Sequence, residues 1–217
     1  MKESDYLAFY QQSFNTVEIN NTFYHLPSSK TIEAWRDKTE RTFRFSAKAS
    51  RYITHMKKLN KPEEALERYF DRMDILDGKL DVVLFQLPPN WNFNRERLQS
   101  FLELLKDGYR HAFEFRDTSW IRQETYELLG EFKAAFCIYD FNGYQSPREV
   151  TSDFVYIRLH GPDGPYQGSY SEKMLAGWAD AITSWVAQKK DVYCYFDNDQ
   201  NAYAPLNAKR LKELLQA

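Results

Sequence analysis

The sequence predicts an α/β protein of the TIM-type (β/α)-barrel class, and three observations carry that prediction. Strand-like runs alternate with helix-like runs along nearly all of the 217 residues, which is typical of parallel sheets with crossover helices. Each strand-like run has one apolar face and one face that ends in a polar residue, whereas a doubly wound sheet needs apolar residues on both faces. No G-x-G-x-x-G loop follows a strand, so we expect no nucleotide cofactor.

The predicted strands are short, rich in aromatic and β-branched residues, and bounded by turn formers. They are the runs 14–20, 43–49, 82–87, 112–116, 135–140, 154–160 and 192–197. Capping residues mark the predicted helices, among them Ser4, Ser28, Asn60 and Asn94. These helices cover 4–13, 28–38, 61–76, 95–106, 121–133, 172–189 and 205–216. Only the connection 141–153 lacks a helix signal, and no linker interrupts the chain, so we expect a single domain over 1–217.

Composition limits the compartment and the partners. Hydrophobic residues make up 43% and aromatic residues 17% of the chain, which predicts a folded protein. A net charge of −2 argues against a general nucleic-acid binder. The sequence has no apolar stretch of membrane-spanning length and no signal peptide, so we expect a cytoplasmic protein without a membrane partner. Cys137 and Cys194 fall in predicted strands without metal-ligand spacing and are interpreted as buried thiols.

The polar residues at the strand ends form the predicted site. The last polar residues of the seven strands are Asn20, Lys48, Gln86, Arg116, Asp140, His160 and Asp197. Barrel proteins carry their sites at the carboxyl ends of the strands. A single buried charge is more often half of an internal ion pair, such as Glu114 with Arg158 or Asp140 with Arg116. Seven strands that end alike nevertheless favour a shared site, because buried charge is costly without a use.

Roles within the predicted site follow from side-chain chemistry. We expect the catalytic acids and bases to be Glu18, Glu114, Asp140 and His160. We expect the substrate-binding residues to be Asn20, Lys48, His55, Gln86, Arg116, Arg158, Tyr170, Asp197 and Asn198. Arginine and lysine suit a phosphate or a carboxylate. The loop 161–170 suits a hinged cover in which Tyr166 and Tyr170 close over a ligand.

Six runs resemble the YecE-like family, which is also called domain of unknown function 72. They are FNTVEINNTFYHLPS, FRFSAKASRYITH, LFQLPPNW, AFEFRDTSW, YIRLHG and YCYFDND. The resemblance spans nearly the whole chain and implies a TIM-type barrel, but it implies no reaction. Family members usually begin with a strand in a glycine- and tryptophan-rich segment, whereas this chain starts at the helix that follows. We therefore expect seven strands with the first of eight lacking, an open barrel as one outcome, and self-association through the edges at 14–20 and 192–197.

The function remains open among several interpretations. The first is an enzyme, a hydrolase or an isomerase, that acts on a small polar or anionic substrate such as a sugar phosphate. The second is a small-anion binding or sensing module, for which the same basic residues would serve. A divalent-metal hydrolase ranks lower because the sequence has no paired-histidine motif, and we assign no metal ligands. A glycosidase would use Glu18 and Glu114 with Trp91 and Trp120 as stacking residues, although both tryptophans fit packing better.

Overall fold

The computed structural model describes residues 5–216. The chain divides into two compact units, of which the first ends at Leu128 and the second begins at Leu129. Parallel strands connected by helices form the framework of each unit. Ser4, a predicted helix cap, lies outside the described residues. The expectation of a single domain over the whole chain stays a prediction.

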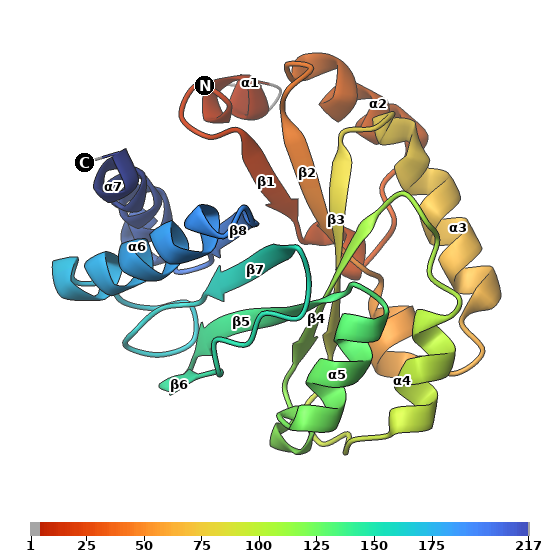
Figure 1. Ribbon diagram of the computed structural model, residues 1–217. Coiled ribbons are helices and arrows are strands. Elements are labelled where there is room, and N and C mark those ends of the chain that lie inside the picture. The colour runs from red at the N-terminus through yellow and green to blue at the C-terminus, as the bar shows by residue number, and fades with distance from the viewer. Residues whose placement is uncertain (1–4, 217) are drawn as a thin grey trace. The chain divides into compact units, whose positions relative to one another are not determined.

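The first unit is a parallel sheet with helices along one face. Its strands β1 (Thr16–Ile19), β2 (Arg44–Lys48), β3 (Leu80–Leu87) and β4 (Arg110–Phe115) are neighbours in chain order. The helices are α1 (Tyr6–Tyr10), α2 (Ser29–Lys38), α3 (Glu63–Met73) and α4 (Arg95–Leu102), and α5 (Gln123–Glu131) runs on into the second unit. Figure 1 shows α2, α3 and α4 along the same side of β2, β3 and β4.

Side-chain caps fix two of the predicted helix starts. Ser28 Oγ accepts a hydrogen bond from the Thr31 N–H at 3.1 Å, and Asn94 Oδ1 accepts one from the Arg97 N–H at 2.9 Å. Each cap satisfies a backbone donor that the helix leaves unpaired. Asn60, by contrast, does not cap α3, which begins at Glu63 after Pro62. The sequence signal was misplaced there because residues with left-handed backbone conformations precede Pro62 and delay the helix.

An aromatic ladder forms the core under the helices of the first unit. Phe85 and Phe113 are register partners on β3 and β4, with ring centroids 5.2 Å apart. Phe115 continues the ladder and stacks on Trp120 at 5.1 Å, while Phe101 of α4 meets Phe85 edge-on at 5.0 Å. The apolar face of these strands therefore packs against helices, as the side-chain alternation predicted. Trp120 is fully buried in this packing, so it is not available to stack on a sugar.

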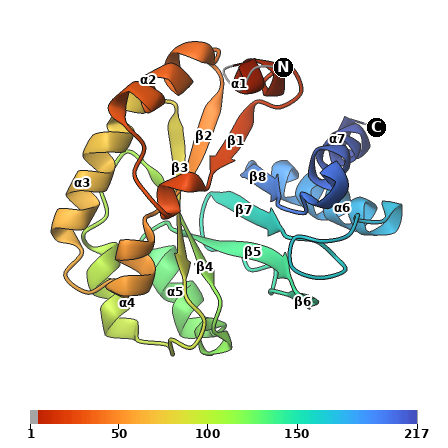
Figure 2. The ribbon, with the colours of Figure 1, turned by 180° about the vertical axis from the view of Figure 1, so that it is seen from behind.

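The second unit has a parallel sheet of the order β5-β7-β8. These strands are β5 (Ala135–Phe141), β7 (Phe154–Leu159) and β8 (Asp191–Phe196), and the two-residue strand β6 (Tyr144–Gln145) pairs antiparallel with β5. The connection without a helix signal thus carries a hairpin strand. The helices are α6 (Glu172–Ala187) and α7 (Tyr203–Gln216), which lie beside β8 in Figure 2.

Helix α6 packs through the apolar stripe that the sequence predicted, with one exception. Leu175, Trp178, Ile182 and Trp185 are buried, whereas Val186 is 55% exposed. Val186 follows Trp185 directly, and one residue step of about 100° rotates it off the stripe. Among residues 5–216, none of the helices combines the length and hydropathy that a membrane span needs. Cys137 and Cys194 are free thiols, and burial raises the pKa of Cys194 to about 12.

Two glycines of the second unit make a matched test of this backbone. Gly161 has a φ of +113°, and a Cβ there would overlap the carbonyl oxygen of Gln167. Gly177 lies within α6 with open space around its Cα. We expect Gly161→Ala to lower the free energy of unfolding by about 1–3 kcal/mol and Gly177→Ala to raise it by about 0.5–1 kcal/mol. Urea unfolding of both variants checks this, and equal effects would contradict the described loop.

Candidate functional site

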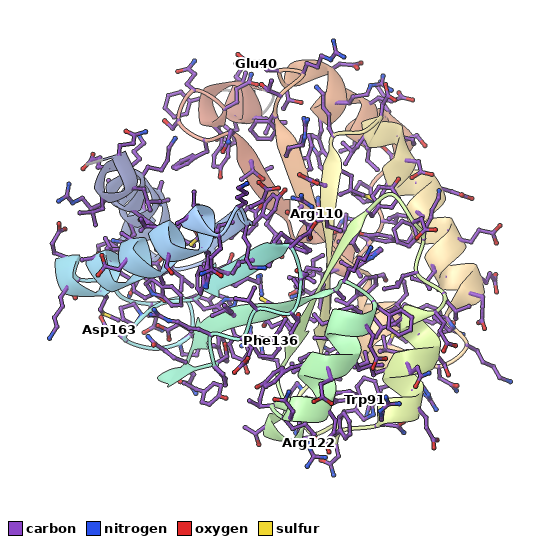
Figure 3. All side chains as sticks on the ribbon, viewed as in Figure 1. Glu40, Trp91, Arg110, Arg122, Phe136 and Asp163 are labelled. Atoms are coloured by element: carbon purple, nitrogen blue, oxygen red, sulfur yellow. The ribbon has the colours of Figure 1, made fainter. Side chains whose placement is uncertain are left out.

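The polar face of the first unit carries the predicted residues at the carboxyl ends of its strands. Glu18 is the register partner of Ser46, and Gln86 is the partner of Glu114. Register partners in a parallel sheet point to the same face, so these side chains lie opposite the aromatic ladder. The side-chain alternation predicted from the sequence is confirmed for β1 to β4. Trp91 and Arg122, labelled in Figure 3, belong to the segments that follow β3 and β4.

Lys48 is the cation at the end of β2. Its Nζ donates to Gln86 Oε1 at 2.7 Å and lies 4.2 Å from the ring centroid of Phe23. The Thr22 hydroxyl donates to the Lys48 carbonyl at 2.7 Å, which ties the segment after β1 to the end of β2. Lys48 and Gln86 are both half-buried. Their head groups therefore lie within reach of solvent and of a small ligand.

Glu114 and Arg116 form an ion pair at the end of β4. Arg116 Nε donates to Glu114 Oε1, and the two side chains are 9% and 0% exposed. The two residues of this pair lie two positions apart at one strand end. The pairs that the sequence suggested, Glu114 with Arg158 and Asp140 with Arg116, stay predictions. The guanidinium beside this buried carboxylate offsets part of the cost of burying its charge. The catalytic role of Glu114 remains a prediction.

His55 lies in the loop after β2 and contacts the same group of residues. Its Nδ1 is 2.9 Å from Thr54 Oγ1, and its ring meets Phe23 edge-on at 4.9 Å. Burial, together with the nearby charges of Lys48 and Arg51, lowers the pKa of His55 to about 4. The imidazole is therefore neutral at pH 7. The charges that lower this pKa belong to the cations Lys48 and Arg51, so the local electrostatic potential at His55 is positive.

In the second unit, Arg158, His160 and Asp197 form a buried cluster at the ends of β7 and β8. Arg158 Nη2 lies 2.8 Å from Asp197 Oδ2, and His160 Nδ1 lies 3.1 Å from the same oxygen. Arg158 Nη1 is 3.3 Å from His160 Nε2. A guanidinium can only donate, so Nε2 faces it as the acceptor of that contact, and Nδ1 faces the carboxylate. Asp197 thus holds both partners, as an orienting carboxylate does.

Asp140 lies on the other face of this sheet, which differs from the expectation. It is the register partner of Leu159, whereas Arg158 pairs with Tyr139 on β5. Side-chain alternation was correct along β5, but alternation alone does not decide which face turns toward the helices. Asp140 accepts from Gln145 Nε2 at 3.1 Å and from the Tyr170 hydroxyl. Burial raises the pKa of Asp140 above its usual value, and these hydrogen bonds offset only part of that shift.

Tyr170 anchors the loop after β7, and its role in ligand binding stays a prediction. It is 3% exposed, and its hydroxyl oxygen accepts from the Gly161 N–H at 3.0 Å. Its own N–H donates to Asn207 Oδ1 at 3.1 Å, and Asn198 Nδ2 donates to the same oxygen at 2.8 Å. The predicted hinged cover is thus pinned at its base, because both its first and its last residue are hydrogen-bonded. The tip carries Asp163, labelled in Figure 3, and the 51% exposed Tyr166.

Asn207 is a site residue that sequence reasoning missed. It lies on the buried stripe of α7 together with Ala204 and Leu211. An amide at an apolar helical position is the signal that could have found it, since such a group requires buried partners. Thr22 was missed for a different reason, because its partner Lys48 O is 26 residues away.

The structure thus brings the predicted residues together in two sets, one in each unit. The first set is Glu18, Asn20, Lys48, His55, Gln86, Glu114 and Arg116, and the second is Asp140, Arg158, His160, Tyr170, Asp197 and Asn198. The convergence of all seven strand ends on one point stays a prediction. Within residues 5–216, no group of three histidine, cysteine, aspartate or glutamate side chains is arranged to hold a metal ion.

Comparison with known proteins identifies the family. A family model described as "Protein of unknown function DUF72" matches residues 1–217. The chain belongs to this family. UPF0759 protein YunF of Bacillus subtilis is 28% identical to it, over 96% of this chain and 86% of YunF. UPF0759 protein YecE of Escherichia coli K12 is 31% identical over 51% of this chain and 41% of YecE.

Solved structures of DUF72 proteins share the fold. A DUF72 family protein of Thermotoga maritima MSB8 matches with a TM-score of 0.88 and 29% identity, over 100% of this chain and 91% of that one. A DUF72 family protein of Enterococcus faecalis V583 matches with a TM-score of 0.87 and 20% identity, over 99% and 92% of the two chains. The resemblance to the YecE-like family and the α/β-barrel fold class are both confirmed.

Two aspartates of the second unit should respond oppositely to the same substitution. Because the folded pKa of Asp140 is raised, this carboxylate favours folding at low pH and loses that contribution as pH rises through the folded pKa. We expect Asp140→Asn to raise the free energy of unfolding at pH 7 and to leave it nearly unchanged at pH 3. Asp197→Asn should lower it by about 3 kcal/mol, because the buried Arg158 guanidinium loses the charge of a carboxylate 2.8 Å away. Urea unfolding at both pH values checks the pair, and a large loss of stability in Asp140→Asn would contradict the described environment.

Proposed function

We propose that this DUF72 protein is an enzyme that acts on a small anionic substrate at the strand ends of its first unit. Lys48 and Arg116 would hold the anion, with Gln86 and Asn20 as uncharged hydrogen-bonding partners. The observation that carries the proposal is the position of these four side chains at the carboxyl ends of β1 to β4. Asn20, Lys48 and Gln86 are half-buried there, and the Arg116 side chain is 9% exposed. A phosphate or carboxylate there would gain charge-assisted hydrogen bonds at a partly desolvated position.

The electrostatics of His55 support an anionic ligand. Lys48 and Arg51 both disfavour the imidazolium form of His55, so the same charges would attract an anion. A bound anion would offset them and raise the pKa of His55 from about 4 toward its usual value. His55 would then accept a proton when the substrate is present, which is what a general base needs to do. Glu18 and Glu114 are the carboxylates on the same face.

A binding or sensing module without catalysis is the second candidate, and one observation favours it. His160, the other histidine of the predicted site, is fully buried and held between Arg158 and Asp197. If His55 does not titrate with the ligand, no described histidine would be both accessible and tuned for proton transfer. The binding residues would then serve an anion sensor equally well.

Phosphate binding tests the anion site directly. Inorganic phosphate at about ten times its dissociation constant should raise the melting temperature by about 3 °C. Lys48→Met keeps the side-chain length next to Phe23 but removes the charge, so we expect it to abolish this shift. Lys30→Met removes an exposed charge from α2 and serves as the control that keeps the shift. An equal phosphate response in both variants would exclude Lys48 as a ligand-binding residue.

Proton NMR titration of His55 distinguishes the two candidate functions. We expect the free protein to show a His55 pKa of about 4. The enzyme proposal requires this pKa to rise when phosphate is bound, and Lys48→Met should raise it without phosphate because a neighbouring positive charge is lost. A His55 titration that phosphate leaves unchanged would favour the binding module.

A further inference from the structure

Positive charge is concentrated in one stretch of the first unit. From residue 41 to residue 62 the sequence has no aspartate or glutamate, while the whole chain has a net charge of −2. The lysines and arginines of this stretch are Arg41, Arg44, Lys48, Arg51, Lys57, Lys58 and Lys61. Four of them, from Arg51 to Lys61, lie in the loop between β2 and α3. The loop is therefore strongly basic although the net charge of the whole chain is slightly negative.

The loop is ordered by its own apolar residues. Ile53 and Leu59 are 1% and 2% exposed, and the Leu59 N–H donates to the Ile53 carbonyl at 3.0 Å. Lys58 and Lys61 are exposed, and both have left-handed backbone conformations, with φ of 48° and 44°. The buried residues thus fix the loop while the cations face solvent. A loop backbone that is already ordered loses little conformational entropy on binding.

Aromatic and apolar side chains lie among these cations. Tyr52 is 47% exposed and Met56 is 65% exposed, and Lys57 Nζ lies 5.5 Å from the Tyr52 ring centroid. The neighbouring segment adds Tyr24, which is 69% exposed and meets Phe23 edge-on at 5.0 Å. We define the basic loop surface by its cations and its exposed large side chains. Its residues are Tyr24, Arg51, Tyr52, Met56, Lys57, Lys58, Lys61 and Arg97.

Arg97 extends this surface onto α4. Its Nη1 donates to the Lys58 carbonyl at 3.3 Å, so α4 and the loop are in direct contact. Acidic residues border the surface at the start of α3, where Glu63 and Glu64 are exposed, and on α4 at Glu96. The cations of this surface are therefore bordered by carboxylates on α3 and α4.

We propose that the basic loop surface binds single-stranded nucleic acid. Lysine and arginine neutralise successive phosphates, and exposed tyrosine rings stack on unpaired bases. Tyr52 lies on the π-helical turn Tyr52–Met56, beside Lys57. A nucleotide whose phosphate contacts this lysine could therefore stack its base on the Tyr52 ring. Duplex readout is not favoured, because the surface is a loop and presents no helix to enter a major groove.

Fluorescence anisotropy with a labelled single-stranded oligouridylate of twelve nucleotides tests the proposal. The full chain should bind it at low salt, with a slope of log affinity against log salt of about −3 for four phosphate contacts. Lys58→Gln with Lys61→Gln should reduce that slope by about 1.4. Tyr52→Ala should weaken binding by about fivefold or more through lost stacking. The control Lys173→Gln with Lys209→Gln removes two exposed lysines from the second unit and should change neither quantity.

Four outcomes would overturn the proposal. The first is no binding at low salt, and the second is an equal loss of affinity in the control variant. The third is unchanged affinity in Tyr52→Ala together with equal competition by inorganic polyphosphate, which would leave charge alone as the cause. The fourth is that the protein binds vesicles containing phosphatidylserine but does not bind the oligonucleotide. Circular dichroism of each variant shows whether it remains folded. Because Lys48 is unchanged in all of these variants, the result is independent of the proposed anion site.

Discussion

The strict alternation of side chains across parallel strands is the constraint on which the rest of the structure depends. In the first unit it sends Phe85, Phe113 and Phe115 to the helices and leaves the opposite face to Glu18, Lys48 and Glu114. Burying the aromatic ladder supplies the main driving force for folding. The same burial carries the polar residues to the opposite face. The polar face is therefore a consequence of the core as well as a candidate site.

The charged side chains on that face have two different environments. Glu114 and Arg116 neutralise each other where burial is nearly complete. Lys48 is only half-buried, and its charge, with that of Arg51, contributes to the lowered pKa of His55. A positive potential at a partly desolvated strand end is the physical basis of the proposed anion site. The basic loop that follows β2 extends positive charge from this strand end onto the surface.

The second unit uses buried polar groups mainly to hold its backbone. Asn207 accepts hydrogen bonds from Tyr170 and Asn198, and Tyr170 in turn joins Gly161 to Asp140. Each of these groups is costly to bury alone and is stabilised by its partners. His160 and Arg158 are held by Asp197 in the same manner. The loop after β7 is consequently held by hydrogen bonds at both ends.

The sequence by itself determined the order of strands and helices, the two faces of β1 to β4, and the family resemblance that fixes the fold class. These depend on local periodicity, turn residues and contiguous motifs, all of which can be read along the chain. Tertiary structure alone decided that Asp140 faces Tyr170, that Glu114 pairs with Arg116, and that Asn207 joins two distant loops. Periodicity defines the two faces of a strand but not which face turns toward the helices. Partners of buried polar groups depend on strand register and helix docking, and neither is encoded in the spacing of a single segment.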